Sequence, residues 1–171
     1  EAVQADGSKR VIDRDVSVRA DTSMEALAQL QPSFKPGGLI TAGNSSPLNA
    51  GASAIMLMSK KTAKKYNLKP LAKIISMGWA GVDPTLMGKG PVPASRKALE
   101  HAGLKAKDID FWEINEAFAS VPIAACREHG IDEEKVNFSG SGCSDFASRV
   151  KSWAATVGLP VLVRKSRPVA P

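Results

Sequence analysis

The sequence predicts an α/β fold in which helices cover a mixed or parallel sheet. Its 171 residues are 43% hydrophobic and 23% charged, which is typical of a globular chain with apolar material for one core. Short apolar runs of strand length alternate with segments whose apolar residues recur at helical spacing. Glycine and proline stand where these helical segments stop and start. Such alternation is the pattern of layered α/β proteins.

The first 37 residues are polar and irregular, and we expect them to form a loop region. Within them a short helix is predicted over 23–30, with Asp21 or Thr22 as its candidate cap. A short strand is predicted at 39–41. The small polar residues 42–51 follow with two glycines and almost no bulk, so backbone there can approach a ligand closely. A tight surface turn has the same composition.

The middle of the chain predicts a strand, a helix and a second strand. Residues 52–58 are apolar, and a charged helix is predicted over 60–66 that ends near Asn67. Residues 71–79 are rich in isoleucine and predict a buried strand. The loop 81–93 carries three glycines and three prolines, a composition that suits a fixed irregular path.

The next helix is predicted over 93–102, because Pro93 is a favoured first residue and Gly103 a favoured stop. A strand is predicted over 109–114, and another helix over 117–129, with Gly130 as its stop. The order strand, helix, strand, helix is therefore repeated along the chain.

The net charge of +6 is concentrated in two basic segments, 60–65 and 164–167. Lysines at such spacing are typical of the solvated face of a helix, and the scattered aromatic residues offer no platform for stacking bases. We therefore expect no nucleic-acid partner. The apolar runs are too short to cross a bilayer, so we expect no membrane span and an intracellular protein, whether cytoplasmic, mitochondrial or peroxisomal.

The two cysteines, Cys126 and Cys143, have neither CxxC spacing nor paired histidines nearby. No metal site or disulfide framework is therefore expected. Cys126 lies on the apolar side of a predicted helix and is expected in the core. His101 and His129 are interpreted as surface or helix-end residues.

Residues 111–119 are the most informative segment, because a strand-like stretch gives way to Asn115 and Glu116 and then resumes as a helix. Such a junction places Asn115 beyond the carboxyl end of a strand, where α/β folds bind ligands. It also places Glu116 near a helix N-terminus, whose dipole favours a carboxylate. An ordinary strand-to-helix turn with a capping asparagine fits the same residues.

Four motifs occur in order along the chain: Thr41-Ala42-Gly43-Asn44-Ser45-Ser46, Gly81-Val82-Asp83-Pro84, Met87-Gly88-Lys89-Gly90-Pro91-Val92-Pro93-Ala94 and Asn115-Glu116-Ala117-Phe118. Together they resemble the thiolase family. The resemblance runs from about residue 21 to about residue 142 and implies a thiolase-like layered α/β/α fold. It divides the chain into part of a loop region (1–37), the end of the N-terminal half-domain (38–69), the start of the C-terminal half-domain (70–144) and a divergent tail (145–171).

The resemblance implies an acyl-CoA acyltransferase of fatty acid metabolism that uses no separate cofactor, because the coenzyme A thioester is the substrate. Asn115 matches the family's oxyanion-hole asparagine, which holds a water molecule against the thioester oxygen. Ser46 matches a serine that contacts the pantetheine of coenzyme A, and Met87 matches a methionine that lines the acyl pocket. Glu116 and Phe118 complete the expected substrate-binding set, Glu116 by orienting the loop or the active-site water.

The chain also departs from the family pattern. The family's nucleophilic cysteine lies upstream of the Thr41 motif and has no counterpart before it here. Residues 139–144 continue without the family's Gly-His-Pro motif, and the motif that holds the second catalytic cysteine is missing. Cys143 is either a structural thiol or a replacement nucleophile. We expect a thiolase fragment or truncated member, or alternatively an inactive module that binds coenzyme A esters or a partner subunit.

The implied half-sheet leaves strand edges uncovered, and an exposed strand edge invites association. We therefore expect a homo-oligomer or a partner chain.

Overall fold

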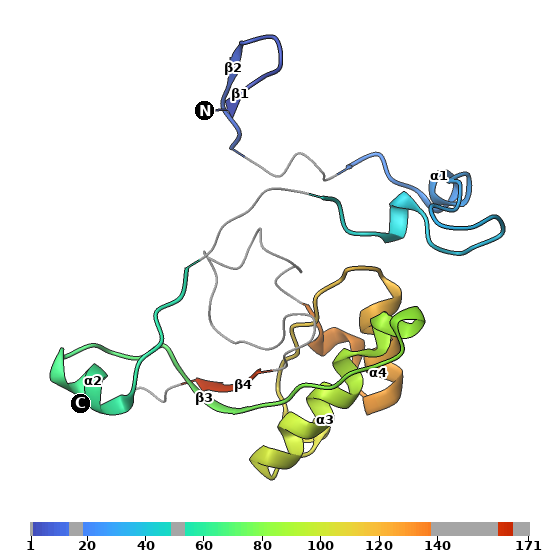
Figure 1. Ribbon diagram of the computed structural model, residues 1–171. Helices are drawn as coiled ribbons and strands as arrows, with labels where there is room; N and C mark the ends of the chain where they lie inside the picture. Colours follow the sequence, from blue (N-terminus) through green and yellow to red (C-terminus); the bar gives the residue numbers. More distant parts are fainter. Residues whose placement is uncertain (1, 14–18, 49–53, 138–160, 166–171) are drawn as a thin grey trace. The chain divides into compact units, whose positions relative to one another are not determined.

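The computed structural model describes residues 2–13, 19–48 and 54–137, and the backbone of 161–165 (Figure 1). The chain divides into two compact units. The first comprises Glu1–Gly43 and Pro47–Asn49, and the second comprises Asn44–Ser46 and Ala50–Pro171.

The first unit contains a short hairpin and a short helix. Strand β1 (Ala2–Val3) pairs antiparallel with β2 (Lys9–Arg10). Helix α1 (Met24–Ala28) begins after Ser23, whose hydroxyl oxygen accepts a hydrogen bond from the Ala26 N–H at 3.1 Å. This bond satisfies a backbone donor that the first turn of a helix leaves without a partner.

Two predictions for this unit were wrong in detail. Ser23 caps α1, rather than Asp21 or Thr22, because it stands immediately before the helix with extended backbone. The strand predicted at 39–41 is reduced to a single antiparallel bridge between Pro32 and Thr41, after which the short 3-10 helix η1 (Ala42–Asn44) begins.

The second unit is built around two helices that pack together, α3 (Pro91–Ala102) and α4 (Ser120–His129) (Figure 1). Both end at a glycine in the left-handed region, Gly103 at φ 67° and Gly130 at φ 65°, as the sequence predicts. Helix α3 starts two residues before the predicted Pro93. The core between them consists of Val92, Ala98, Leu99, Trp112, Ile114, Val121 and Ala125.

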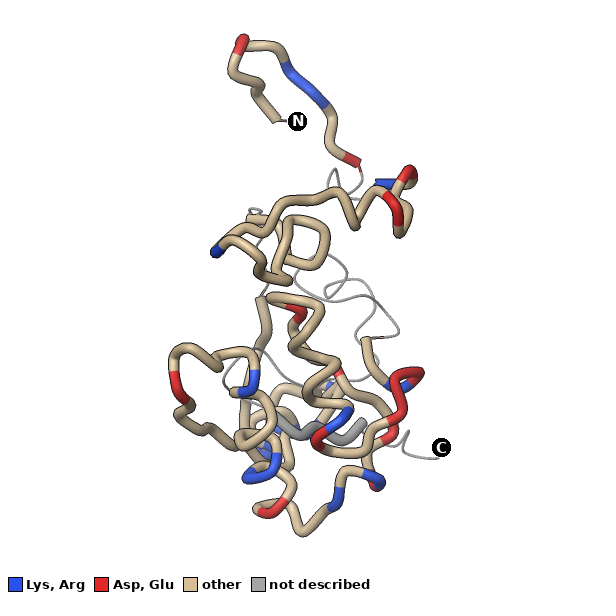
Figure 2. Tube along the Cα trace, turned by 90° about the vertical axis from the view of Figure 1, so that its right-hand side faces the viewer, with Lys and Arg blue, Asp and Glu red and all other residues tan. Residues whose placement is uncertain are grey.

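Helix α2 (Lys60–Lys65) confirms the predicted charged helix. Ser59 caps its first turn, and its four lysines are exposed. Basic and acidic residues are interspersed along the described trace (Figure 2). Residues 54–58, the described part of the run predicted as a strand, are assigned to no strand.

Strand β3 (Ala72–Met77) pairs antiparallel with β4 (Val161–Lys165), so the tail supplies its neighbour. The predicted burial of this strand was wrong, since Ile74 and Ile75 are 41% and 38% exposed. Isoleucine content indicates a strand but does not determine which partner covers its faces. The strand predicted at 109–114 is reduced to a parallel bridge between Trp112 and Val136.

The segment after β3 is held against α3. The Ser76 hydroxyl donates to the Ala98 carbonyl at 2.6 Å, and Gly78 is buried beside the same helix. A Cβ added at Gly78 would collide with the Ala94 carbonyl oxygen and lie 2.6 Å from the Ala98 nitrogen. Both are helical backbone atoms, so no side-chain movement relieves the overlap.

We therefore expect Gly78→Ala to destabilise the second unit by about 1–3 kcal/mol, the usual cost of overpacking. Urea denaturation measures the difference. Gly81→Ala is the matched control, because no atom lies within 4 Å of a Cβ at Gly81 and its φ is not positive. Equal stability of the two variants would contradict this packing.

His129, at the last residue of α4, is half-buried rather than a purely surface residue. Its ring stacks on Trp112 with the centroids 5.5 Å apart. Its Nε2 lies 2.8 Å from the Ser95 hydroxyl, which donates to the Pro91 carbonyl and so accepts from Nε2–H. Burial, assisted by the nearby Arg96 charge, lowers the pKa of His129 below 6.5.

This lowered pKa predicts a loss of stability in mild acid. As the pH falls below about 6.5, the unfolded chain takes up a proton at His129 more readily than the folded chain, so the free energy of unfolding decreases. His129→Phe keeps an aromatic ring against Trp112 and should remove this part of the pH dependence. His101→Gln, a change at an exposed histidine, should retain it in denaturation measured between pH 5 and 8.

Candidate functional site

The backbone before Asn115 is fixed by a parallel pairing with residues 135–137. The Trp112 N–H donates to the Lys135 carbonyl at 2.8 Å, and the Asn137 N–H donates to the Trp112 carbonyl at 2.9 Å. Trp112 and Ile114 are each 4% exposed, whereas Glu113 and Asn115 are only partly buried. Because side chains alternate along an extended chain, Asn115 lies on the face opposite the core.

The Asn137 side chain extends this pairing by one further step. The Ile114 N–H donates to Asn137 Oδ1 at 2.7 Å, and Asn137 Nδ2 donates to the Ile114 carbonyl at 2.8 Å. The same Nδ2 also donates to Glu116 Oε1 at 2.6 Å. One carboxamide therefore contacts the residues on both sides of Asn115.

The backbone after Asn115 pairs with the Thr41 motif. The Ser46 N–H donates to the Ala117 carbonyl at 3.1 Å, and the Ala119 N–H donates to the Asn44 carbonyl at 2.9 Å, on either side of an antiparallel bridge between Ser45 and Phe118. The structure thus brings the predicted site residue Ser46 next to the segment that carries Asn115.

This pairing corrects the prediction for Glu116. Residues 117–119 are used in the bridge, so α4 begins at Ser120 and not at Ala117. Glu116 therefore does not stand directly before the helix, as a helix beginning at Ala117 would require, and its carboxylate accepts from Asn137. The Glu116 charge adds to burial, the larger effect, in raising the pKa of Glu113.

Met87 and Phe118, two further predicted site residues, have different surroundings. Met87 lies on the 3-10 segment η2 (Pro84–Lys89), capped by Asp83, and is 43% exposed. The segment packs against α4, where a Cβ on Gly88 would lie 3.3 Å from Val121. Within the described residues, no hydrogen bond joins Met87 to Asn115. Phe118 packs against the core.

Comparison with known proteins identifies the family. The model of the thiolase C-terminal domain matches residues 68–144, and the model of the thiolase N-terminal domain matches residues 1–61. The chain belongs to the thiolase family.

Two thiolase relatives illustrate the similarity. A 3-ketoacyl-CoA thiolase of Hahella chejuensis is 50% identical over 139 residues, which cover 79% of this chain and 36% of the relative. An acetyl-CoA acetyltransferase of Syntrophomonas wolfei is 52% identical over 132 residues, covering 76% and 33%. The chain thus spans about a third of the length of these relatives.

Solved thiolase structures resemble the chain in fold. The Bacillus anthracis acetyl-CoA acetyltransferase matches with TM-score 0.69 and 49% identity over 74% of this chain and 32% of its own. Human mitochondrial 3-ketoacyl-CoA thiolase matches with TM-score 0.69 and 43% identity over the same shares. A structure of that human protein in complex with CoA matches with TM-score 0.63, 38% identity and the same coverage. The predicted thiolase-like α/β fold class is confirmed.

Of the two cysteines, Cys126 lies in the part of the chain that the structure describes. Cys126 is buried and free, as predicted, and burial raises the pKa of its thiol, which leaves it unsuited to act as a nucleophile. Cys143 and the glycine-rich segment 139–144 lie outside the described residues. Within the described ranges, no helix has the length and apolar character that crossing a membrane requires.

Asn137 is the residue beside Asn115 that the sequence analysis did not identify. The sequence predicts no element at residue 137, and in the structure the φ of Asn137 is 51°, in the left-handed region. Asparagine is among the few residues other than glycine that adopt this region readily. An asparagine shortly before the glycine-rich residues 139–144 was therefore the available signal.

Proposed function

We propose that this chain carries the oxyanion-stabilising part of a thiolase-type acyl-CoA C-acyltransferase, with Asn115 as the oxyanion-hole residue. The observation that supports it is the fixing of the backbone on both sides of Asn115, through Asn137 before it and Ser46 after it. Stabilisation of a developing negative charge requires donors that are already in place before the reaction.

The chemistry of a carboxamide suits this role. Its NH2 group donates hydrogen bonds while carrying no charge, so it can stabilise a thioester oxygen directly or through a water molecule as negative charge accumulates there. A carboxylate at the same position would repel that charge. Removing one oxyanion-hole donor typically lowers kcat by about 10²–10³-fold.

The remaining site residues have roles in binding within this proposal. The Ser46 hydroxyl would contact the polar pantetheine chain of coenzyme A. Met87 would line the acyl pocket, because its flexible thioether adapts to apolar groups of irregular shape. Phe118 would support the site from the core, and Glu116 would orient the loop. The substrate is an acyl-CoA thioester, and no further cofactor is required.

We expect Asn115→Asp to weaken binding of acetyl-CoA to the purified chain by about tenfold, on the scale of one hydrogen bond. Binding of coenzyme A itself should not change, because it has no thioester oxygen. Titration calorimetry with both ligands measures this difference. Asn67→Asp, the same chemical change at the end of α2, is the matched control and should leave both affinities unaltered.

Acetyl-CoA binding that is indifferent to Asn115→Asp would refute the proposed role. A thiolysis assay distinguishes a catalytic chain from an inactive module that binds coenzyme A esters. Turnover that falls by about 10²–10³-fold in Asn115→Ala supports a catalytic chain. Binding without turnover would instead support a module that recognises coenzyme A esters.

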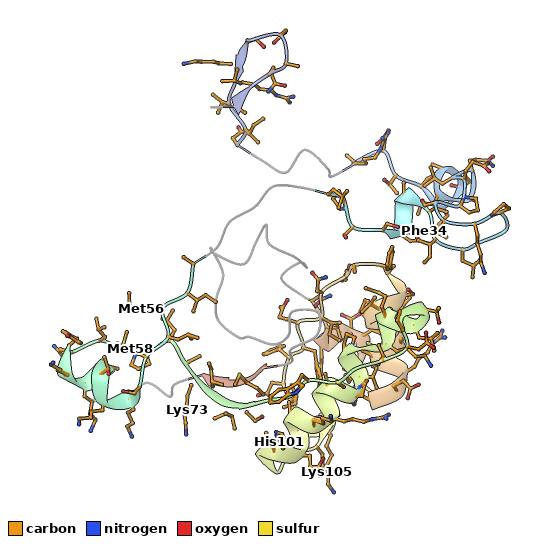
Figure 3. The ribbon with its side chains drawn as sticks, viewed as in Figure 1. Phe34, Met56, Met58, Lys73, His101 and Lys105 are labelled. Atoms are coloured by element: carbon orange, nitrogen blue, oxygen red, sulfur yellow. The ribbon has the colours of Figure 1, made fainter. Side chains whose placement is uncertain are left out.

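The proposal includes association with a second copy or a partner chain. Ile55, Met56 and Leu57 are each more than half exposed, and Figure 3 shows the Met56 side chain and that of Met58 on the segment before α2. Contiguous exposed apolar side chains commonly mark interaction surfaces.

We therefore expect sedimentation at micromolar concentration to show species larger than the monomer. Met56→Lys should shift the distribution towards monomer, because it places a charge in this apolar segment. Lys73→Glu, a change on β3 that leaves the segment intact, serves as the control (Figure 3). A monodisperse monomer at high concentration would contradict the expectation.

A further inference from the structure

We propose that Asn137 is a positioning residue that sets the orientation of Asn115, by using its side chain in place of a backbone peptide unit. The inference rests on the proposed function of Asn115 and deepens it. In a parallel ladder, a residue donates from its N–H and accepts at its carbonyl from two peptide units of the neighbouring strand. Trp112 does so with the backbone of Lys135 and Asn137.

At Ile114 the same two bonds are made by the Asn137 carboxamide, whose oxygen accepts at 2.7 Å and whose nitrogen donates at 2.8 Å. A carboxamide carries the same donor and acceptor as a peptide unit. The left-handed backbone of Asn137, at φ 51°, departs from strand geometry at this residue. The side chain thus makes the ladder bonds at the residue where the backbone leaves strand geometry.

The third bond of Asn137 reaches past Asn115. Its Nδ2 has two hydrogens, and the second is donated to Glu116 Oε1 at 2.6 Å. Ile114 and Glu116 flank Asn115, so both neighbours of the oxyanion residue are held by one planar group. Because Asn137 holds the Ile114 backbone and the Glu116 side chain, the direction in which the Asn115 side chain leaves the backbone is restrained as well.

Only asparagine meets all of these requirements. Aspartate has the same shape and can accept from the Ile114 N–H, but it places an acceptor opposite the Ile114 carbonyl and the Glu116 carboxylate. Glutamine is one methylene longer. Glycine accepts the backbone conformation but offers no carboxamide. The isosteric change Asn137→Asp therefore keeps the shape and the acceptor, removes the donor and places a negative charge opposite the Glu116 carboxylate.

The partner residue offers a rescue. Glu116→Gln presents an amide that can donate to the carboxylate introduced by Asn137→Asp, so the double variant Asn137→Asp with Glu116→Gln restores one bond with its direction reversed. We expect Asn137→Asp to weaken acetyl-CoA binding by about tenfold more than coenzyme A binding. This is the effect of losing the one hydrogen bond that Asn115 would make to the thioester oxygen. The double variant should recover most of this loss.

The matched control is again Asn67→Asp. Asn67 and Asn137 are the non-glycine residues with positive φ in the part of the chain that the structure describes, and both have φ 51°. The change at Asn67 tests the cost of aspartate in this backbone conformation without touching the site. It should leave ligand discrimination and the rescue experiment unaffected.

A ligand-free measurement separates this inference from the proposed function. In NMR spectra of the free chain, Asn137→Asp should shift the Asn115 side-chain amide signals and accelerate exchange of the Ile114 amide hydrogen. Glu116→Ala, which leaves the two bonds to Ile114 intact, should shift the Asn115 signals with little effect on Ile114 exchange. If Asn137→Asp fails to fold, the Glu116→Ala variant alone tests whether these bonds position Asn115.

Unchanged Asn115 signals in both variants would overturn the inference, even if Asn115→Asp supports the oxyanion role. A purely structural Asn137 would lower the melting temperature and weaken both ligands equally, with no rescue by Glu116→Gln, and this also would overturn it. If the unaltered chain binds no acetyl-CoA, the proposed function fails while the NMR comparison still tests the positioning.

Discussion

The parallel pairing between residues 112–114 and 135–137 is the interaction on which the described site depends. It holds an extended segment against α3 and α4, with Trp112 and Ile114 turned into the core and Trp112 stacked on His129 of α4. The alternation of side chains then leaves Glu113 and Asn115 on the other face. Because Trp112 and Ile114 are buried, the side chain of Asn115 is left on the face away from the core.

Competition for residues 117–119 explains why α4 begins late. Their sequence suits a helix, yet they pair with Asn44–Ser46 and so join two motifs that lie about 70 residues apart in the sequence. Helix propensity contributes less than about 1 kcal/mol per residue, so a few tertiary hydrogen bonds outweigh it over a single turn. The shortened helix leaves Glu116 within reach of Asn137.

The features that could be predicted from the sequence are those determined by neighbouring residues. The stops at Gly103 and Gly130 and the extent of α2 depend on local backbone preferences, and they were predicted correctly. The extent of the strand over 109–114 and the exposure of β3 depend on partners far along the chain, which periodicity does not identify. The order of the four motifs indicated the family and drew attention to Asn115. The hydrogen bonds of Asn137 could not be predicted from the sequence, because they depend on how two distant segments lie in the fold.

The use of a side chain at Asn137 determines how the residue before Asn115 is held. The Asn137 carboxamide makes both ladder bonds to Ile114, one residue before Asn115. The polar junction is thus held on that side by the same pair of bonds that a parallel strand makes. Under the proposed function, such a junction gives Asn115 the fixed position that charge stabilisation requires.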